Sequence, residues 1–388
     1  MKRLITLILV VALALSVCAC SPTASDPVAV LWADGDSAVN PNSLINAMDR
    51  AMYIENIRYT YFGAQGDAAK QLQQAEEALA AGCSVLAVEP IDPAAAEQFV
   101  ELAKAKDVPI LFFNKAIDES VVASYTKCYA VYTEEDSLAK TYFDLVGAYV
   151  LKNTEVEKAK DGDLDLDDDG KISYVTVGEI VLAETTAIEK DKNDEPKLNK
   201  DGSYKKAVEL VKLEAAFADL QLVEDTRESG GLFGGTTTYR QLKTADGKVV
   251  ELILVEDDVQ AKDVLIALQE KGMNADQLAT CFVPVFTVGN TVDYKALVLE
   301  NAPTEADARK AHFEANKFLC DLTVVEEGDL EEMLFTTLNV IDTGRITGTA
   351  LADYDGIAEA VAKTAAAICK GKTAEQTTLI PYTTHENG

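Results

Sequence analysis

Short apolar segments and amphipathic segments alternate through the first third of the chain. Runs such as V-A-V-L-W at 28–32 and V-P-I-L-F-F at 108–113 have the composition of buried strands, and the segments between the runs carry apolar residues at helical spacing. The expected strands are 28–32, 57–62, 85–88 and 108–113, and the expected helices are 41–54, 70–81 and 93–106. Strand, helix, strand units repeating about every 30 residues predict a doubly wound α/β domain with a parallel sheet.

A second series of the same kind begins near residue 137. It is interrupted by a charged insertion at 189–206 and by a glycine-rich stretch at 230–235. The expected helices are 137–151, 207–218, 261–271 and 357–369, and the expected strands are 174–177, 220–223, 249–255 and 282–288. Two α/β lobes in one exported chain favour a protein that binds a ligand in a cleft, with contacts at the carboxyl ends of the strands.

The N-terminus has the pattern of an export signal. Lys2 and Arg3 precede an apolar run at 4–17, which is too short for a permanent membrane helix. The run ends V-C-A-C-S, which resembles a bacterial lipobox and makes Cys20 the expected lipidation site. We therefore expect an extracytoplasmic protein that is lipid-anchored to the cell membrane, with a signal peptide at 1–20 and a polar tether at 21–26. A plain secreted protein is the alternative.

Charge and cysteine content exclude several classes. The net charge of −30 repels the phosphates of nucleic acids, so nucleic-acid binding is not expected. Beyond the signal, five cysteines stand at irregular spacing, which fits neither a paired disulfide framework nor a zinc motif. Buried thiols are expected instead, at Cys83, Cys128, Cys281, Cys320 and Cys369.

The segment D-L-D-D-D-G-K-I-S at 165–173 places oxygen ligands where a calcium loop needs them. Gly170 stands at the sixth position, where such a loop turns sharply, but Thr176 replaces the glutamate usual at the twelfth. The segment is therefore either a solvated acidic turn or a calcium loop that takes its last carboxylate from elsewhere. The ligands within the segment would be Asp165, Asp167, Asp169, the carbonyl of Lys171, and Ser173.

Several segments together resemble the galactose/glucose-binding protein family, whose members are substrate-binding components of sugar ABC transporters. The segments are C-S-V-L-A-V-E-P-I-D-P-A-A-A at 83–96, V-P-I-L-F-F-N-K at 108–115, Y-A-V-Y-T-E-E-D-S at 129–137, and the acidic loop. The resemblance implies that Glu251 completes a structural calcium site. It also implies a type I periplasmic binding protein fold with two parallel-sheet lobes joined by a hinge, one at 27–114 plus about 352–378 and one at 115–351 plus about 379–388, with insertions near 189–206 and 291–338.

The sugar contacts of the family are largely rewritten in this sequence. The segment 178–187 lacks the histidine, aspartate and arginine that the family places there, and Glu89 replaces an amide. A polyol, an amino sugar or another cationic ligand could then be preferred over neutral galactose. The expected ligand-binding residues are Trp32, Asp36, Glu89, Asn114, Glu184, Phe233, Asp257 and Asn290.

The function expected from these observations is that of a monomeric solute-binding lipoprotein. It would bind a monosaccharide-like ligand between two closing lobes and be read by an ABC permease or a chemosensory membrane protein. No nucleophile elbow or zinc motif indicates an enzyme, and a signal sequence stands where a repressor would carry a DNA-binding motif. A divergent sensor or scaffold that has lost sugar binding is the alternative.

Overall fold

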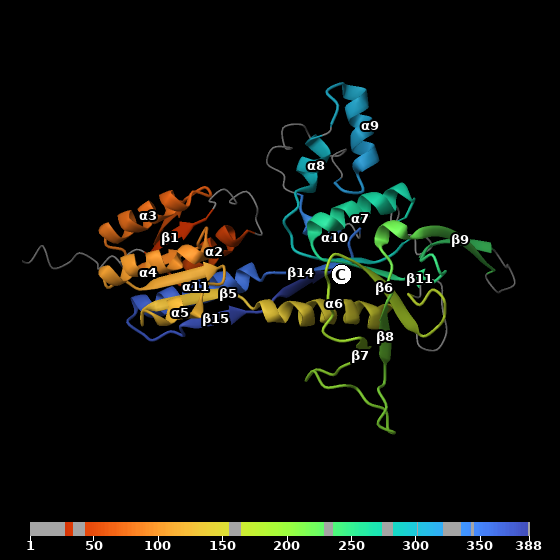
Figure 1. Ribbon diagram of the computed structural model, residues 1–388, viewed down its shortest axis with the longest axis horizontal. Coiled ribbons are helices and arrows are strands. Elements are labelled where there is room, and N and C mark those ends of the chain that lie inside the picture. Colours follow the sequence, from red (N-terminus) through yellow and green to blue (C-terminus); the bar gives the residue numbers. More distant parts are fainter. Residues whose placement is uncertain are drawn as a thin grey trace, which may run out of the picture. The chain divides into compact units, whose positions relative to one another are not determined.

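The computed structural model forms two compact units, and it describes residues 28–33, 43–154, 164–228, 236–273, 282–300, 302–320, 335–342 and 345–386 (Figure 1). Unit 1 holds the described residues up to Thr133 together with Asp353–Ile380, and unit 2 holds Glu134–Ala352 and the residues from Pro381 on. The first boundary falls after the expected residue 114, because β5 (Cys128–Thr133) pairs in parallel with β4 (Ile110–Asn114).

Unit 1 is built around an all-parallel sheet in the order β15-β5-β4-β3-β1-β2. The order reverses at β1, so the switch point of this sheet lies between β1 and β3. The four strand segments expected in this part of the sequence all form. Besides β4 and β5, the strands are β1 (Val28–Trp32), β2 (Tyr59–Gly63), β3 (Val85–Val88) and β15 (Thr377–Ile380).

Helices cover both faces of this sheet, which gives unit 1 two hydrophobic clusters. α2 (Leu44–Ile54) and α11 (Tyr354–Cys369) pack on one face. α3 (Ala68–Ala80), α4 (Ala96–Ala105) and α5 (Glu119–Ala123) pack on the other. The strands are buried on both faces, and this explains why their sequences are continuous apolar runs rather than alternating ones.

Unit 2 contains a mixed sheet in the order β16-β14-β13-β12-β6-β8-β7. The five inner strands run parallel, and the edge strands β7 and β16 run antiparallel to their neighbours. The switch point lies between β6 and β12, because β6 is the first of the parallel strands in the chain and lies inside the sheet. The strands are β6 (Lys171–Val177), β7 (Thr186–Ile188), β8 (Ala207–Lys212), β12 (Leu252–Val255), β13 (Val285–Val288), β14 (Gly348–Leu351) and β16 (Thr383–Glu386).

The helices of unit 2 also lie on both faces of its sheet (Figure 1). α6 (Leu138–Asn153) covers one face, where its Tyr142 and Phe143 join the core. α7 (Asp258–Glu270) covers the other face, together with α8 (Tyr294–Glu300), α9 (Ala306–Asn316) and α10 (Thr337–Asp342). The expectation of two α/β parallel-sheet lobes is confirmed by the two sheets.

One expected helix is a strand. The segment 207–218 was expected to be helical, but its first half is β8, followed by a short 3-10 turn, η5 (Phe217–Asp219). Val208 and Leu210 are buried while Ala207 and Glu209 are exposed, which is the alternation of a strand with one covered face. β8 forms because it pairs with β6, and the spacing of apolar residues within the segment could not reveal this long-range contact.

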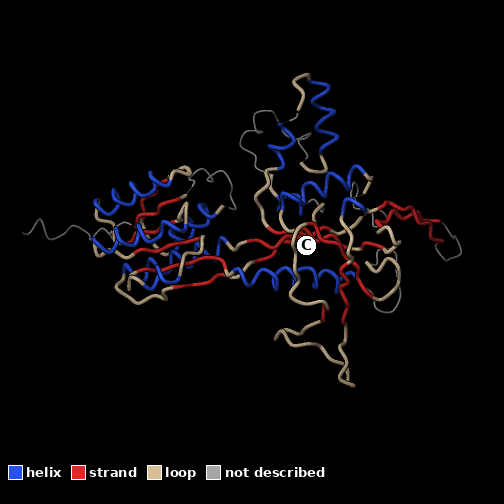
Figure 2. Tube along the Cα trace, in the orientation of Figure 1, coloured by secondary structure: helices blue, strands red, loops and turns tan. Residues whose placement is uncertain are grey.

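The expected strand 249–255 is broken at Glu251. Its first part, β11 (Val249–Val250), belongs to a separate antiparallel sheet with β10 (Thr236–Lys243) and β9 (Gln221–Glu228), drawn as long red strands in Figure 2. Its second part, β12, is a central strand of the large sheet. Glu251 therefore stands at the junction of two sheets. The insertion 189–206 contains isolated antiparallel bridges, Lys190 with Pro196 and Leu198 with Tyr204.

No helix among the described residues is long and apolar enough to cross a membrane. The apolar run at 4–17 and the proposed lipidation site Cys20 lie outside the described residues.

Candidate functional site

The acidic loop closes around the side chain of Asp165. Its carboxylate accepts hydrogen bonds from the backbone N–H of Asp169 at 3.1 Å and of Gly170 at 2.9 Å, and the side chain is buried. The loop has a left-handed backbone at two positions, with φ of 59° at Asp168 and 79° at Gly170. Gly170 therefore has the backbone conformation expected of the glycine at the turn of a calcium loop.

Glu251 is the buried acid next to this loop. Only 1% of its surface is exposed, and its two carboxylate oxygens accept the backbone N–H of Leu166 at 2.5 Å and of Ser173 at 2.7 Å. Because Leu166 belongs to the loop and Ser173 to β6, the carboxylate binds the loop to the sheet. The break between β11 and β12 allows this side chain to face the loop.

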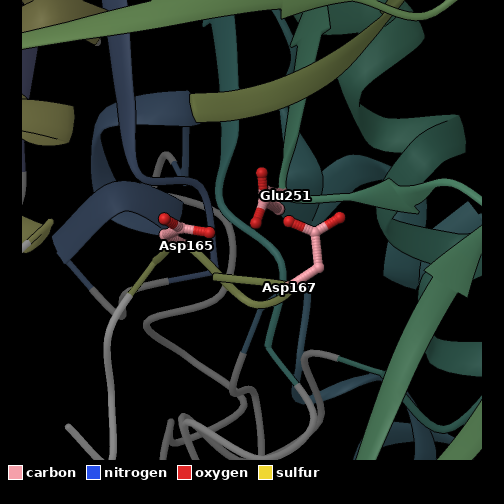
Figure 3. Close-up of side chains that lie close together, drawn as sticks. All are labelled: Asp165, Asp167 and Glu251. Atoms are coloured by element: carbon pink, nitrogen blue, oxygen red, sulfur yellow. The ribbon is translucent and has the colours of Figure 1, made fainter. Parts of the chain in front are cut away.

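Asp165, Asp167 and Glu251 bring one carboxylate oxygen each within 4.8 Å of one another. Figure 3 shows the three side chains gathered at one place, two from the loop and one from the sheet junction. In the described part of the chain, no other group of three or more acidic, histidine or cysteine side chains has this spacing. Clustered carboxylate oxygens without nitrogen or sulfur donors suit a hard divalent cation such as calcium.

The charges of the cluster favour a bound cation. Burial, with a smaller contribution from the charges of Asp167 and Asp165, raises the pKa of Glu251 to about 8 against the opposing effect of its two backbone hydrogen bonds. Burial is also the main cause that raises the pKa values of Asp165 and Asp167. Three carboxylates that repel one another in a half-buried place would each gain from a bound divalent ion, so the residues fit a metal site.

Of the other three expected calcium ligands, the carbonyl of Lys171 and the side chain of Ser173 stay predictions. Asp169 accepts the backbone N–H of Lys171 at 2.8 Å and is not one of the clustered acids. The Lys171 ammonium pairs with Glu209 at 2.9 Å. Ser173 pairs with Glu251 through its backbone N–H. The structure thus unites three of the six residues by their side chains.

In unit 1, Glu89 occupies the switch point of the sheet. It follows β3 directly, and its carboxylate accepts the backbone N–H of Ala33, just after β1, at 3.2 Å and the Asn114 amide at 2.6 Å. Asn114 ends β4 with a left-handed backbone, φ 69°, which stores strain in a non-glycine residue. Two of the expected ligand residues, Glu89 and Asn114, therefore lie together at the edge where such sheets bind ligands.

Trp32 is a core residue. Its side chain is 2% exposed, lies edge-on to Phe113 with ring centroids 5.1 Å apart, and is 6.3 Å from the ring of Tyr61. Its indole N–H is buried with no hydrogen-bond partner.

The remaining expected ligand residues are not brought together. In unit 2, Asp257 caps α7 by accepting the N–H of Gln260 at 2.8 Å, and Asn290 accepts the N–H of Leu338 at 3.1 Å. Glu184 is exposed in the loop before β7. Asp36 and Phe233 lie outside the described residues.

Two acids of unit 2 were not predicted from the sequence. Glu256 follows β12 directly, and its carboxylate accepts the backbone N–H of Glu179 at 2.9 Å. Asp258 is 2% exposed and accepts four hydrogen bonds, from the backbone and hydroxyl of Thr291, from the backbone of Val292 and from the hydroxyl of Thr337. The run E-D-D directly after an apolar strand was the available signal.

Comparisons with known proteins give both similar sequences and similar structures. The D-galactose/methyl-galactoside binding periplasmic protein of Haemophilus influenzae is 30% identical over 125 residues, which is 32% of this chain and only 35% of that relative's length. Among solved structures, a solute-binding protein of an ABC transporter from Bacillus halodurans C-125 with bound myo-inositol has a TM-score of 0.42 at 14% identity, covering 94% of this chain and 96% of that one. A periplasmic ribose ABC transporter protein from Conexibacter woesei has a TM-score of 0.46 at 12% identity, covering 93% and 91%.

The family assignment comes from residues 28–305, which match the model of the family described as "Periplasmic binding protein domain". This match spans most of the chain and includes both Glu89 and Glu251. The family is one of non-enzymatic binding proteins, which confirms the expectation that the chain is not an enzyme. The chain belongs to the periplasmic binding protein domain family.

Proposed function

We propose that the chain is an extracytoplasmic solute-binding lipoprotein of a galactose/glucose-type sugar ABC transporter. The observation that carries the proposal is the match of residues 28–305 to the periplasmic binding protein family. The galactose-binding relative, 30% identical over 125 residues, supports a monosaccharide-like ligand. The N-terminal signal and its lipobox support export and a lipid anchor on Cys20. An ABC permease or a chemosensory membrane protein is the proposed partner.

Ligand contacts are proposed at the carboxyl ends of the parallel strands. Glu89 and Asn114 are the best supported, because they lie together at the switch point of unit 1 and bind each other at 2.6 Å. Trp32 is proposed to support this edge from the core rather than to touch the ligand, since it is 2% exposed. Asp36 and Phe233 stay proposals from the resemblance alone.

A structural calcium ion is proposed at the acidic loop. Asp165, Asp167 and Glu251 would hold it, and carbonyl oxygens of the loop would complete the shell. The ion would neutralise the three clustered charges and hold the loop to the sheet. It would take no part in ligand chemistry and would stabilise unit 2 by mass action.

The proposed function is tested by calorimetry and thermal shift on the mature protein. The panel contains D-galactose, D-glucose, D-ribose, myo-inositol and D-glucosamine. Binding of at least one compound with micromolar or tighter affinity is expected, and failure of the whole panel would reject the sugar-binding function. The melting temperature is also compared in calcium and in chelator, because the metal site and the ligand-binding strand ends are tested independently.

A sensor or scaffold that has lost sugar binding is a second candidate. The observation that favours it is the internal use of polar groups at the strand ends of unit 2, where Asp257 caps α7 and Asn290 binds the backbone of Leu338. A protein that binds calcium but no member of the panel would support this candidate.

A further inference from the structure

The two units repeat one arrangement at their switch points. In unit 1, the residue directly after β3, Glu89, accepts the backbone N–H of Ala33, which follows β1. In unit 2, the residue directly after β12, Glu256, accepts the backbone N–H of Glu179, which lies two residues past β6. In each unit a glutamate carboxylate is thus held by the backbone at the edge where α/β sheets bind ligands.

The arrangement in unit 2 depends on a glycine. Gly178 has φ of 83°, and a Cβ atom there would lie 2.2 Å from Glu256 Oε2. Only glycine accepts both this backbone conformation and the close approach of the carboxylate. The backbone at Gly178 therefore leaves the space that the Glu256 carboxylate occupies.

The described residues at the edge of unit 1 offer a ligand more acceptors than donors. An ionised carboxylate is acceptor-only and has about four lone-pair sites, of which Glu89 uses two. Asn114 turns its NH₂ group toward Glu89, which leaves its amide oxygen as an acceptor and its second N–H as a donor. The nearest basic side chain in sequence, Lys115, donates to the carbonyl of Ile91 at 3.1 Å, and no ion pair joins it to Glu89 among the described residues.

An ammonium group matches such an edge better than a hydroxyl. It carries three donors and no acceptor, whereas a hydroxyl has two lone pairs that need donors of their own. It also neutralises a half-buried carboxylate for which the described residues provide no cation, and charge-assisted hydrogen bonds are the stronger kind.

We propose that the ligand is an amine-bearing monosaccharide or polyol whose ammonium group binds Glu89. This inference rests on the proposed sugar-binding function and specifies its ligand class. Of the acids expected from sequence it uses Glu89, whereas Glu184 is exposed in a loop and Asp257 caps α7.

The test compares D-glucosamine with D-glucose by calorimetry at about pH 6.5, where a sugar amine is protonated. Trp32, the single tryptophan of the chain, gives a fluorescence signal from the core beside the edge of unit 1. The variants are Glu89→Gln and, as a matched control, Glu97→Gln at an exposed position of α4. Melting temperatures confirm that each variant folds.

D-glucosamine is expected to bind more tightly than D-glucose, and Glu89→Gln is expected to weaken its binding about 10- to 100-fold. Glu97→Gln is expected to change nothing. If Glu89→Gln fails to fold, the unaltered protein still tests the inference. Added salt should weaken its binding of D-glucosamine and leave its binding of D-glucose unchanged. Tighter or equal binding of D-glucose would overturn this inference and leave the sugar-binding function standing. Absence of binding across the whole panel would reject both.

Discussion

Ser173 and Glu251 hold each other by a reciprocal pair of hydrogen bonds. The backbone N–H of Ser173 donates to the Glu251 carboxylate at 2.7 Å, and the backbone N–H of Glu251 donates to the Ser173 carbonyl at 2.9 Å. The pair joins β6 to the junction of β11 and β12. It fixes a buried carboxylate beside the acidic loop, and the consequences of that placement can be measured.

Glu251→Gln should abolish stabilisation by calcium. For the unaltered protein, calcium at about 100 times its dissociation constant should add about 2.7 kcal/mol, which is about 5 to 10 °C in melting temperature for a unit of this size. The variant should melt at the same temperature in calcium and in chelator, as measured by calorimetry. Glu270→Gln, at an exposed position on α7, is the control and should keep the full calcium response. If the melting temperature of the unaltered protein did not change with calcium, the proposed metal site would be refuted.

Asp167→Asn and Asp169→Asn should differ in effect. Asp167 contributes an oxygen to the cluster, whereas Asp169 accepts the backbone N–H of Lys171. We expect Asp167→Asn to weaken calcium binding at least about tenfold, because the charge of the ligand set tunes affinity. Asp169→Asn should change it less than about threefold. Calcium titrations of the two variants measure this, and equal losses would show that the ion uses the full loop.

Asp258→Ala should destabilise unit 2 by about 3 kcal/mol. The buried carboxylate accepts four hydrogen bonds, and its removal leaves those donors unsatisfied. Asp263→Ala, on the same helix but with 68% of the side chain exposed, should cost less than about 0.5 kcal/mol. Urea unfolding of both variants makes the comparison. A loss at Asp258 no larger than at Asp263 would contradict the role of Asp258 as a tie between α7 and the loop after β13.

Cys83 and Cys128 should resist alkylation in the folded protein. Burial raises the pKa of the Cys83 thiol to about 11 and that of Cys128 to about 12, so the reactive thiolate is scarce at pH 8. Because both pKa values are raised, the stability that the neutral thiols contribute is complete below pH 9 and is lost as the pH rises through 11 to 12. Iodoacetamide labelling at pH 8 with peptide mapping should show slow reaction at both sites, and fast reaction only after unfolding in urea.

Cys369 is the contrasting site, because it is exposed at the end of α11, and the expectation of a buried thiol there was wrong. It should be labelled in the folded protein, which provides the internal control for the experiment. Rapid labelling of Cys83 or Cys128 in folded protein would show that unit 1 opens more readily than its packing indicates.

The sequence predicted the architecture of unit 1 well, because its strands are buried on both faces and their apolar runs are unambiguous. Val85–Val88 was located without error, and the helix ends were displaced by only a few residues. It predicted the wrong structure at 207–212, because an alternating segment that is one strand of a sheet satisfies helical spacing as well. The pairing with β6 decided that segment, and such pairing is non-local.

For the site, the sequence by itself determined the candidate residues and left their partners undecided. It singled out the acids of the loop by their spacing, and the family resemblance added Glu251 and Glu89. Only the tertiary structure decided that Asp167 and not Asp169 joins Glu251, that Asp257 is a helix cap, and that Glu89 and Glu256 occupy equivalent strand ends. The physical reason is that the partners of a side chain are set by strand order and register, which bring together residues far apart in the sequence, such as Leu166 and Glu251, 85 positions apart.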